Sequence, residues 1–183
     1  MREDALTGAQ RTASAESIRT ARSPRDIELA RALFVEYARW LKVDLCFQGF
    51  DRELAGLPGA YAPPRGRLLL AGETDAAFGC VALRPLAAGS GCACSAAPPE
   101  AAIAVGEVKR LYVQRARRGE GWGARLARAV VGEARAIGYR ELKLDTLDWM
   151  QAARALYAAL GFRECAPYYE NPLAGVVYMS LAL

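Results

Sequence analysis

Apolar residues recur along the chain at two spacings, one typical of helices and the other typical of strands. The first helical stripe lies between residues 27 and 41, directly after Ser23, Pro24 and Asp26. These three residues favour a helix start, because serine caps free N–H groups, proline suits the first helical position and an acid follows three residues after the cap. The spacing predicts helices over residues 24–41, 51–55, 124–137 (ended by Gly138) and 150–160 (ended by Gly161).

Short runs rich in apolar and β-branched residues predict the strands between these helices. In the last run, alternation places Val177, Met179, Leu181 and Leu183 on one side. A turn at residues 72–75 joins two of the runs into a hairpin. The predicted strands cover residues 17–21, 68–71, 77–83, 105–113, 140–146, 162–165 and 176–183.

Residues 105–124 contain the clearest candidate for chemistry. A strand interrupted by charges leads through an arginine-rich turn into the helix predicted from residue 124, and Arg118, Gly119, Gly121 and Gly123 lie at that helix N-terminus. The first N–H groups of a helix have no internal partner and carry partial positive charge, and glycine lets a phosphate approach them closely. We interpret the stretch as a pyrophosphate cradle. The alternative is a turn that needs glycine, flanked by solvated arginines.

Length and composition fit one globular domain, residues 17–183, after a flexible N-terminal tail of residues 1–16. The chain has 183 residues, 53% hydrophobic and 24% charged. It contains no apolar run of about 20 residues and no secretory h-region near Met1, so we expect a cytoplasmic protein without membrane association. The five cysteines are odd in number and scattered, which favours reduced thiols.

The chain contains no histidine, which excludes Ser-His-Asp and Cys-His mechanisms. Cys92 and Cys94 form the only close cysteine pair and lack further ligands, so we expect no metal site. A net charge of +4 is concentrated in residues 115–128. An anionic cofactor accounts for that excess, whereas nucleic acid requires a larger basic face with aromatic platforms.

Two motifs resemble those of one family. Arg118-x-x-Gly121-x-Gly123 resembles the acyl-CoA pyrophosphate signature of the GNAT superfamily of N-acetyltransferases, and Leu156-Tyr157-Ala-Ala-Leu160-Gly161-Phe162 resembles its second hallmark. The similarity of pattern covers residues 17–183. It implies a single α/β GNAT-like domain with a mixed, mostly antiparallel sheet of six or seven strands, flanked by helices and split in a V at strand 105–113. It also implies transfer of an acetyl group from acetyl-CoA to a primary amine of a small molecule or peptide by direct attack.

The resemblance implies roles for particular residues. Glu107 would take a proton from the acceptor amine, directly or through water, and Tyr157 would protonate the departing thiolate. Alternatively, Glu107 pairs with Lys109 or Arg110, and Tyr157 is a core residue. The cofactor would lie against Leu111, Tyr112, Val113, Arg118, Gly119, Glu120, Gly121, Trp122, Gly123 and Ala124, and the acceptor against Phe47, Gln48, Phe50, Tyr168, Tyr169 and Asn171.

One position departs from the family pattern, since Met150 stands where many members carry asparagine. Nothing in the sequence selects the acceptor, and the sequence is compatible with a homodimer. Two other functions remain open. One is a non-catalytic acyl-CoA sensor, and the other is an NAD(P)-binding protein, because residues 119–124 also satisfy G-x-G-x-x-[GA] and Asp145 could bind a ribose.

Overall fold

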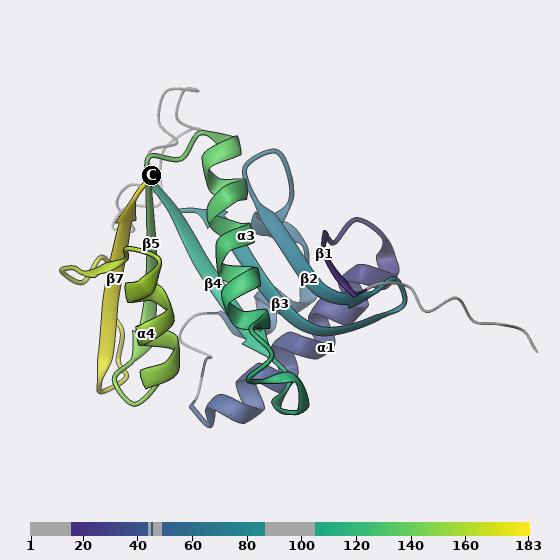
Figure 1. The fold of residues 1–183 in the computed structure, drawn as a ribbon, viewed down its shortest axis with the longest axis horizontal. Coiled ribbons are helices and arrows are strands. Elements are labelled where there is room, and N and C mark those ends of the chain that lie inside the picture. The colour runs from purple at the N-terminus through teal and green to yellow at the C-terminus, as the bar shows by residue number, and fades with distance from the viewer. Residues whose placement is uncertain (1–15, 44, 46–48, 87–104) are drawn as a thin grey trace, which may run out of the picture.

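A seven-stranded mixed sheet forms the centre of this computed structural model, which describes residues 16–43, 45, 49–86 and 105–183 (Figure 1). The strand order is β1-β2-β3-β4-β5-β7-β6, and among these described strands only β4 and β5 pair in parallel. The strands are β1 (Ser17–Thr20), β2 (Arg67–Glu73), β3 (Ala76–Pro85), β4 (Val105–Val113), β5 (Glu141–Leu147), β6 (Arg163–Glu164) and β7 (Val176–Ala182).

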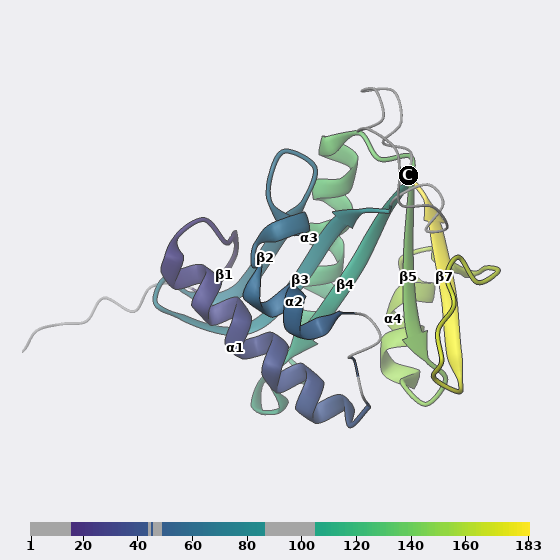
Figure 2. The same cartoon turned by 180° about the vertical axis from the view of Figure 1, so that it is seen from behind.

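Helices cover both faces of the sheet. α3 (Trp122–Ile137) and α4 (Gln151–Ala159) lie on the face seen in Figure 1, and α1 (Pro24–Leu41) and α2 (Phe50–Ala55) lie on the opposite face, seen in Figure 2. Two short 3₁₀ turns span Gly59–Tyr61 and Arg115–Arg117. In the part of the chain that the structure describes, no helix has the length and apolar character needed to cross a membrane.

The predicted start of α1 is confirmed in detail. The Ser23 Oγ accepts a hydrogen bond from the Asp26 backbone N at 3.0 Å, and the Asp26 carboxylate accepts one from the Ser23 backbone N at 3.1 Å. This reciprocal arrangement satisfies two N–H groups that a helix start otherwise leaves without partners. It holds the orientation in which α1 packs on β2, β3 and β4.

Each face of the sheet has its own hydrophobic core. Leu126 and Val130 of α3 pack with Leu142 and Leu144 of β5 in the larger cluster. Phe34 of α1 packs with β2 and β3 residues in the other. Each fully buried leucine or phenylalanine stabilises the fold by about 1.5–3 kcal/mol relative to exposure, so the two cores firmly hold β4, which lies between them.

β4 is irregular at the position that matters for function. Its register against β3 shifts between Cys80 and Ala82, and Arg110 there has a φ of 57°. An extra residue in one strand is a β-bulge, which bends the strand and re-aims side chains. Because of it, Lys109 and Arg110 both contact residues on the α1 face of the sheet.

β4 and β5 separate after Glu107, before the bulge. They pair only from Val105 to Glu107, opposite Glu141 to Lys143, and then diverge (Figure 1). The unpaired edge of β4 therefore borders an opening in the middle of the sheet. This is the predicted V-shaped split.

The predicted fold class is confirmed, with seven strands and two helices on each face. α3 begins at Trp122, before the predicted Ala124, because Gly121 takes the N-cap position. β6 is only two residues long, shorter than the predicted 162–165. The dinucleotide-binding hypothesis is wrong for this fold, because it requires a parallel sheet of repeated βα units and β4–β5 is the only parallel pair among the described strands. The tail before residue 16, Phe47, Gln48, and the Cys92 and Cys94 loop lie outside the described residues.

Candidate active site

The glycine turn opens α3 in the conformation that an anion site needs. Gly119 and Gly121 have φ values of 88° and 81°, which favour glycine, and an added Cβ at either would meet nothing within 4 Å. Gly121 is the N-cap of α3, and no side chain of the described residues caps this helix start. The backbone N–H groups of the first turn are therefore available to a ligand.

Arg118 is held at the edge of this turn. Its Nε donates to the Val113 carbonyl oxygen at 2.9 Å, and its guanidinium lies 4.4 Å from the Trp40 ring centroid. Arg118 also interacts with the Tyr112 side chain, and its guanidinium lies 5.5 Å from the centroid of that ring. Arg118 thus projects charge beside the N-terminus of α3.

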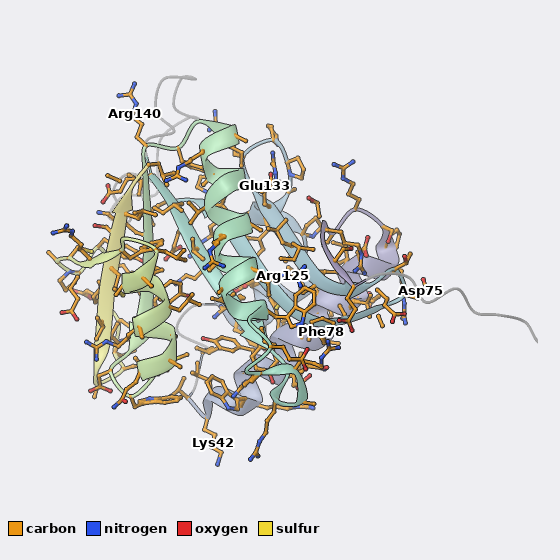
Figure 3. The ribbon with its side chains drawn as sticks, viewed as in Figure 1. Lys42, Asp75, Phe78, Arg125, Glu133 and Arg140 are labelled. Atoms are coloured by element: carbon orange, nitrogen blue, oxygen red, sulfur yellow. The ribbon has the colours of Figure 1, made fainter. Side chains whose placement is uncertain are left out.

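Two of the predicted cofactor residues have side chains committed elsewhere. Trp122 is buried and packs against Phe78 with ring centroids 4.9 Å apart, and Phe78 lies on β3 beside the start of α3 (Figure 3). Glu120 pairs with Arg117 at 2.8 Å between Oε2 and Nη2. Only the backbone groups of Trp122 and Glu120 are free for a cofactor.

A groove runs from this turn along the split between β4 and α4, and we call it the β4–α4 groove. Trp149, half exposed at 51%, lies on its rim with its ring centroid 5.7 Å from that of Trp40. Leu111, Tyr112, Val113, Arg118 and Gly123 of the predicted cofactor set line the groove, together with Trp40, Trp149, Met150, Gln151, Ala152, Ala153 and Leu156. The groove thus joins the glycine turn to the unpaired edge of β4.

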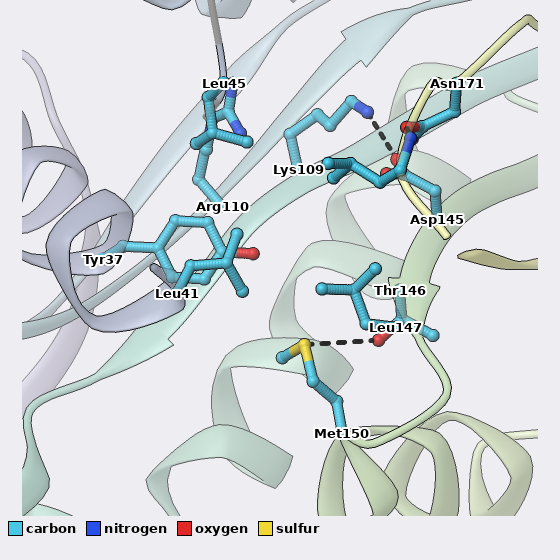
Figure 4. Close-up of a pocket in the computed structure, with 11 residues that line it drawn as sticks. Tyr37, Leu41, Leu45, Lys109, Arg110, Asp145, Thr146, Leu147, Met150 and Asn171 are labelled. Carbon is cyan, nitrogen blue, oxygen red and sulfur yellow. Dashed lines mark hydrogen bonds and ion pairs between the residues drawn. The ribbon is translucent and has the colours of Figure 1, made fainter. Parts of the chain in front are cut away.

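A second hollow, the cleft pocket, opens on the α1 side of the split (Figure 4). It is lined by Tyr37, Leu41, Leu45, Lys109, Arg110, Asp145, Thr146, Leu147, Met150, Asn171 and Leu173. Met150 lines both hollows, and its Sδ is 3.7 Å from the Thr146 Oγ1. The two hollows therefore meet at Met150, at the position where the sequence departs from the family pattern.

Glu107 lies behind the cleft pocket and does not line it. Its side chain is 1% exposed, and its Oε2 is 2.6 Å from the Arg84 Nη2. Its Oε1 accepts from the Tyr168 hydroxyl at 3.0 Å and lies 3.0 Å from the Lys109 Nζ. The expected ion pair with Lys109 is present, whereas Arg110 pairs with Glu53 instead.

Asp145 is the carboxylate that faces the cleft pocket. Its side chain is 15% exposed, and Lys109 donates to its Oδ1 (Figure 4). Burial alone would raise the pKa of Asp145, but the charge of Lys109 and hydrogen bonds from Lys109 and Tyr169 outweigh it, and the pKa lies below its usual value. Lys109 thus bridges a buried carboxylate, Glu107, and an accessible one, Asp145.

The loop before β7 brings together three of the predicted acceptor residues, Tyr168, Tyr169 and Asn171, of which only Asn171 lines the cleft pocket. The Asn171 Nδ2 donates to the Tyr169 hydroxyl at 2.9 Å, and the Tyr178 hydroxyl donates to the Tyr169 carbonyl oxygen at 3.0 Å. The Leu173 backbone N donates to the Asn171 Oδ1 at 3.0 Å, so Asn171 both stabilises the turn and lines the cleft pocket. Phe50, on α2, lies under Arg110 with its ring centroid 5.1 Å from Cζ.

Two tyrosines lie near the split on opposite faces of the sheet, but Tyr37 lines the cleft pocket whereas Tyr157 lines neither hollow. Tyr157 of α4 is buried with its ring edge on Phe162, and burial raises its pKa far above the usual range. Tyr37 of α1 lines the cleft pocket, and burial raises its pKa to about 12. Both hydroxyls therefore keep their protons near neutral pH and are hydrogen-bond donors.

The predicted site residues do not include Lys109, Arg110, Tyr37 or Glu53, and Asp145 is predicted only as a possible ribose ligand. The alternation in β5, where Leu142 and Leu144 are buried, could have placed Asp145 on the open face. No local pattern could have placed Arg110, because the bulge breaks the alternation there.

Comparisons with known proteins agree with this architecture. The model of the acetyltransferase (GNAT) family matches residues 20–162. An uncharacterized N-acetyltransferase of Schizosaccharomyces pombe is 38% identical over 168 residues, which cover 91% of this chain and 94% of that protein.

Solved structures share the fold. An acetyltransferase from Streptococcus agalactiae superposes with a TM-score of 0.68 at 16% identity, covering 92% of this chain and 98% of that one. A GNAT family acetyltransferase from Elizabethkingia anophelis, which has acetyl-CoA bound, gives 0.57 at 20% identity with coverage of 92% and 98%. The chain belongs to the GNAT family and is an N-acetyltransferase.

Proposed function

We propose that the protein transfers the acetyl group of acetyl-CoA to a primary amine of a small molecule or peptide by direct attack. The observation that carries this proposal is the meeting of two hollows at Met150. One leads from an uncapped helix N-terminus, and the other presents a carboxylate. Such an arrangement suits a reaction between a phosphate-bearing donor and a cationic acceptor.

The β4–α4 groove fits acetyl-CoA. The first N–H groups of α3 and the guanidinium of Arg118 would hold the pyrophosphate, and the open space at Gly119 and Gly121 leaves room for it. The edge of β4 at Leu111 and Val113 would offer backbone groups to the pantetheine arm, because β5 does not pair there. Acetyl-CoA supplies the acetyl group as a reactive thioester.

The amine must lose a proton before it attacks. Asp145 lines the cleft pocket and would receive that proton directly or through water, whereas Glu107 is 1% exposed and does not line the pocket. Glu107 therefore acts through Lys109, by fixing the ammonium that holds Asp145. This assigns Glu107 an indirect part in proton removal.

Tyr157 would protonate the departing thiolate, since its hydroxyl is protonated at neutral pH. An acylated cysteine is not needed as an intermediate. Cys80 is fully buried, burial raises the pKa of its thiol well above the usual value, and its Sγ donates to the Arg110 carbonyl oxygen at 3.3 Å. A thiol in that state is a poor nucleophile, so Cys80 is not a candidate for an acylated intermediate.

Binding and turnover can be tested separately. Saturating acetyl-CoA should stabilise the fold, by about 2.7 kcal/mol at 100 times its Kd, and NAD should not. Arg118→Ala should reduce this thermal shift. Arg115→Ala is the matched control, because Arg115 is an exposed arginine of the same turn that does not line the groove.

Release of free CoA is then measured with a panel of small amines, amino acids and peptides. Turnover with at least one acceptor is expected. Binding without turnover across the panel would contradict the enzyme and favour the non-catalytic sensor. The same shift with NAD as with acetyl-CoA would contradict the cofactor.

A further inference from the structure

Arg110 is directed into the cleft pocket by the backbone. It is a non-glycine residue with a φ of 57°, at the bulge where β4 shifts register against β3. Such a conformation is unfavourable for a residue with a Cβ and persists only where the surroundings hold it. In an unbroken strand, Arg110 would point to the α3 core, on the opposite side from Lys109.

The guanidinium of Arg110 is fixed before any ligand arrives. Its Nε and Nη2 donate to the two carboxylate oxygens of Glu53, at 3.0 and 2.6 Å. The Phe50 ring lies against it, and the residue is only 6% exposed. Burial alone would lower the pKa of Arg110, but Glu53 outweighs it and the pKa is raised, so the cation is permanent.

One edge of this guanidinium remains open. Arg110 lines the cleft pocket, and within the described part of the chain its Nη1 makes no hydrogen bond. Among the described residues, Nη1 of Arg110 is not one of the buried polar atoms that lack a partner, so it is accessible from the pocket, where a guanidinium edge favours an anionic partner. The pocket thus contains a rigid anion-binding edge besides its carboxylate.

The rest of the lining is complementary. Asp145 supplies a negative charge on the opposite wall, on β5. Leu41, Leu45 and Leu147 supply an apolar surface between the helix and strand walls. The enclosed space measures only about 40 Å³ and is open to one side, so a ligand that carries an ammonium, a carboxylate and an apolar group would fill it and extend out of it.

We propose that the acceptor is an amino acid with an apolar side chain, whose carboxylate is bound by the free edge of Arg110 and whose amine is bound by Asp145. The inference rests on the proposed acetyl transfer and narrows its acceptor. Arg110 is then a specificity-determining residue. It distinguishes amines that carry a carboxylate from amines that do not.

The test compares leucine with leucinamide and phenylalanine with phenylalaninamide, pairs that differ in the charge of the carboxyl group. A hydrogen bond to a charged group contributes about 1.5–3 kcal/mol, which corresponds to about a 10- to 150-fold higher kcat/KM for the acid. The amide has the less basic amine and the larger fraction of free amine, so intrinsic reactivity acts against this result.

Arg110→Lys keeps the charge beside Glu53 but loses the planar edge, and it should bring the acid-to-amide ratio close to one while changing kcat/KM for the amide little. The double variant Arg110→Gln, Glu53→Gln should do the same without leaving a buried charge unpaired. The matched control is Arg52→Lys, an exposed arginine next to Glu53 on α2. Its ratio should equal that of the wild type.

The outcomes separate this inference from the proposed function. Equal use of acid and amide by the wild type overturns the inference while leaving acetyl transfer intact. An equal loss for both substrates in Arg110→Lys also overturns it, because Arg110 would then serve the fold or the thioester. If no acceptor is acetylated, the thermal shift with leucine in the presence of CoA decides. A thermal shift with leucine that is present in the wild type and abolished by Arg110→Lys supports the carboxylate site. A wild-type protein that shows no shift with leucine overturns the site.

Discussion

Replacing Tyr157 with phenylalanine removes one hydroxyl group and leaves the packed ring in place. The ring contributes to the core through its edge contact with Phe162. No hydrogen bond from the hydroxyl to another described residue is present, so the free energy of unfolding should change by less than about 1 kcal/mol. Tyr157→Ala would instead lower the free energy of unfolding by about 3–5 kcal/mol, because it opens a cavity. A lower rate in that variant could then reflect loss of folded protein and not loss of the proton donor.

The catalytic effect should be much larger. Loss of a positioned proton donor lowers the rate by about 10²-fold, which at 1.36 kcal/mol per tenfold is about 2.7 kcal/mol of transition-state stabilisation. Because burial raises the pKa of Tyr157, the wild-type rate should not fall from its ionisation as the assay pH rises from neutral to mildly alkaline. The phenol is the protonated, active form throughout that range.

The assay is single-turnover acetyl transfer, because steady-state kcat can report product release. Stability is measured in parallel by chemical denaturation. Tyr139→Phe is the matched control: Tyr139 is buried, lies outside both hollows and donates to the Arg65 carbonyl oxygen at 2.9 Å. The Tyr139→Phe variant should have a free energy of unfolding about 1 kcal/mol lower than the wild type and an unchanged rate of acetyl transfer. A Tyr157→Phe rate within roughly threefold of the wild type would refute the proposed proton transfer.

Two further predictions concern the cleft pocket. Asn171→Ala removes the hydrogen bond to the Tyr169 hydroxyl and should lower kcat/KM for the amine about 10-fold, while the KM for acetyl-CoA stays unchanged. Steady-state kinetics measures both constants, and equal effects on the two substrates would contradict the prediction. Acid should destabilise the fold: burial acts to raise the pKa values of Asp145 and Glu53, but their cationic partners outweigh it and hold both below their usual values. The stabilisation from these two carboxylates is fully present above their unfolded-state pKa values of about 4, and it is lost as the pH falls through their lower folded-state pKa values. The free energy of unfolding, measured by urea denaturation, should therefore be lower near pH 3 than at pH 7. Equal values would contradict the prediction.

The sequence by itself determined the local elements and the cofactor turn. Ser23, Pro24 and Asp26 predict the start of α1 because a capping box involves only residues close together in the chain. Gly119 and Gly121 predict the turn before α3 because few other residues adopt positive φ. Hydrophobic periodicity likewise located the strands, since burial on one face repeats every second residue.

Only the tertiary structure decided how the charged residues of β4 are used. The carboxylate of Glu107 is enclosed by Arg84 of β3 and by Tyr168, 61 residues further along the chain. Arg110 faces the cleft pocket because a bulge adds one residue to β4, and Glu53 of α2 then holds it there. These contacts depend on strand register and on the packing of distant segments, and neither leaves a periodic signal in the residues themselves.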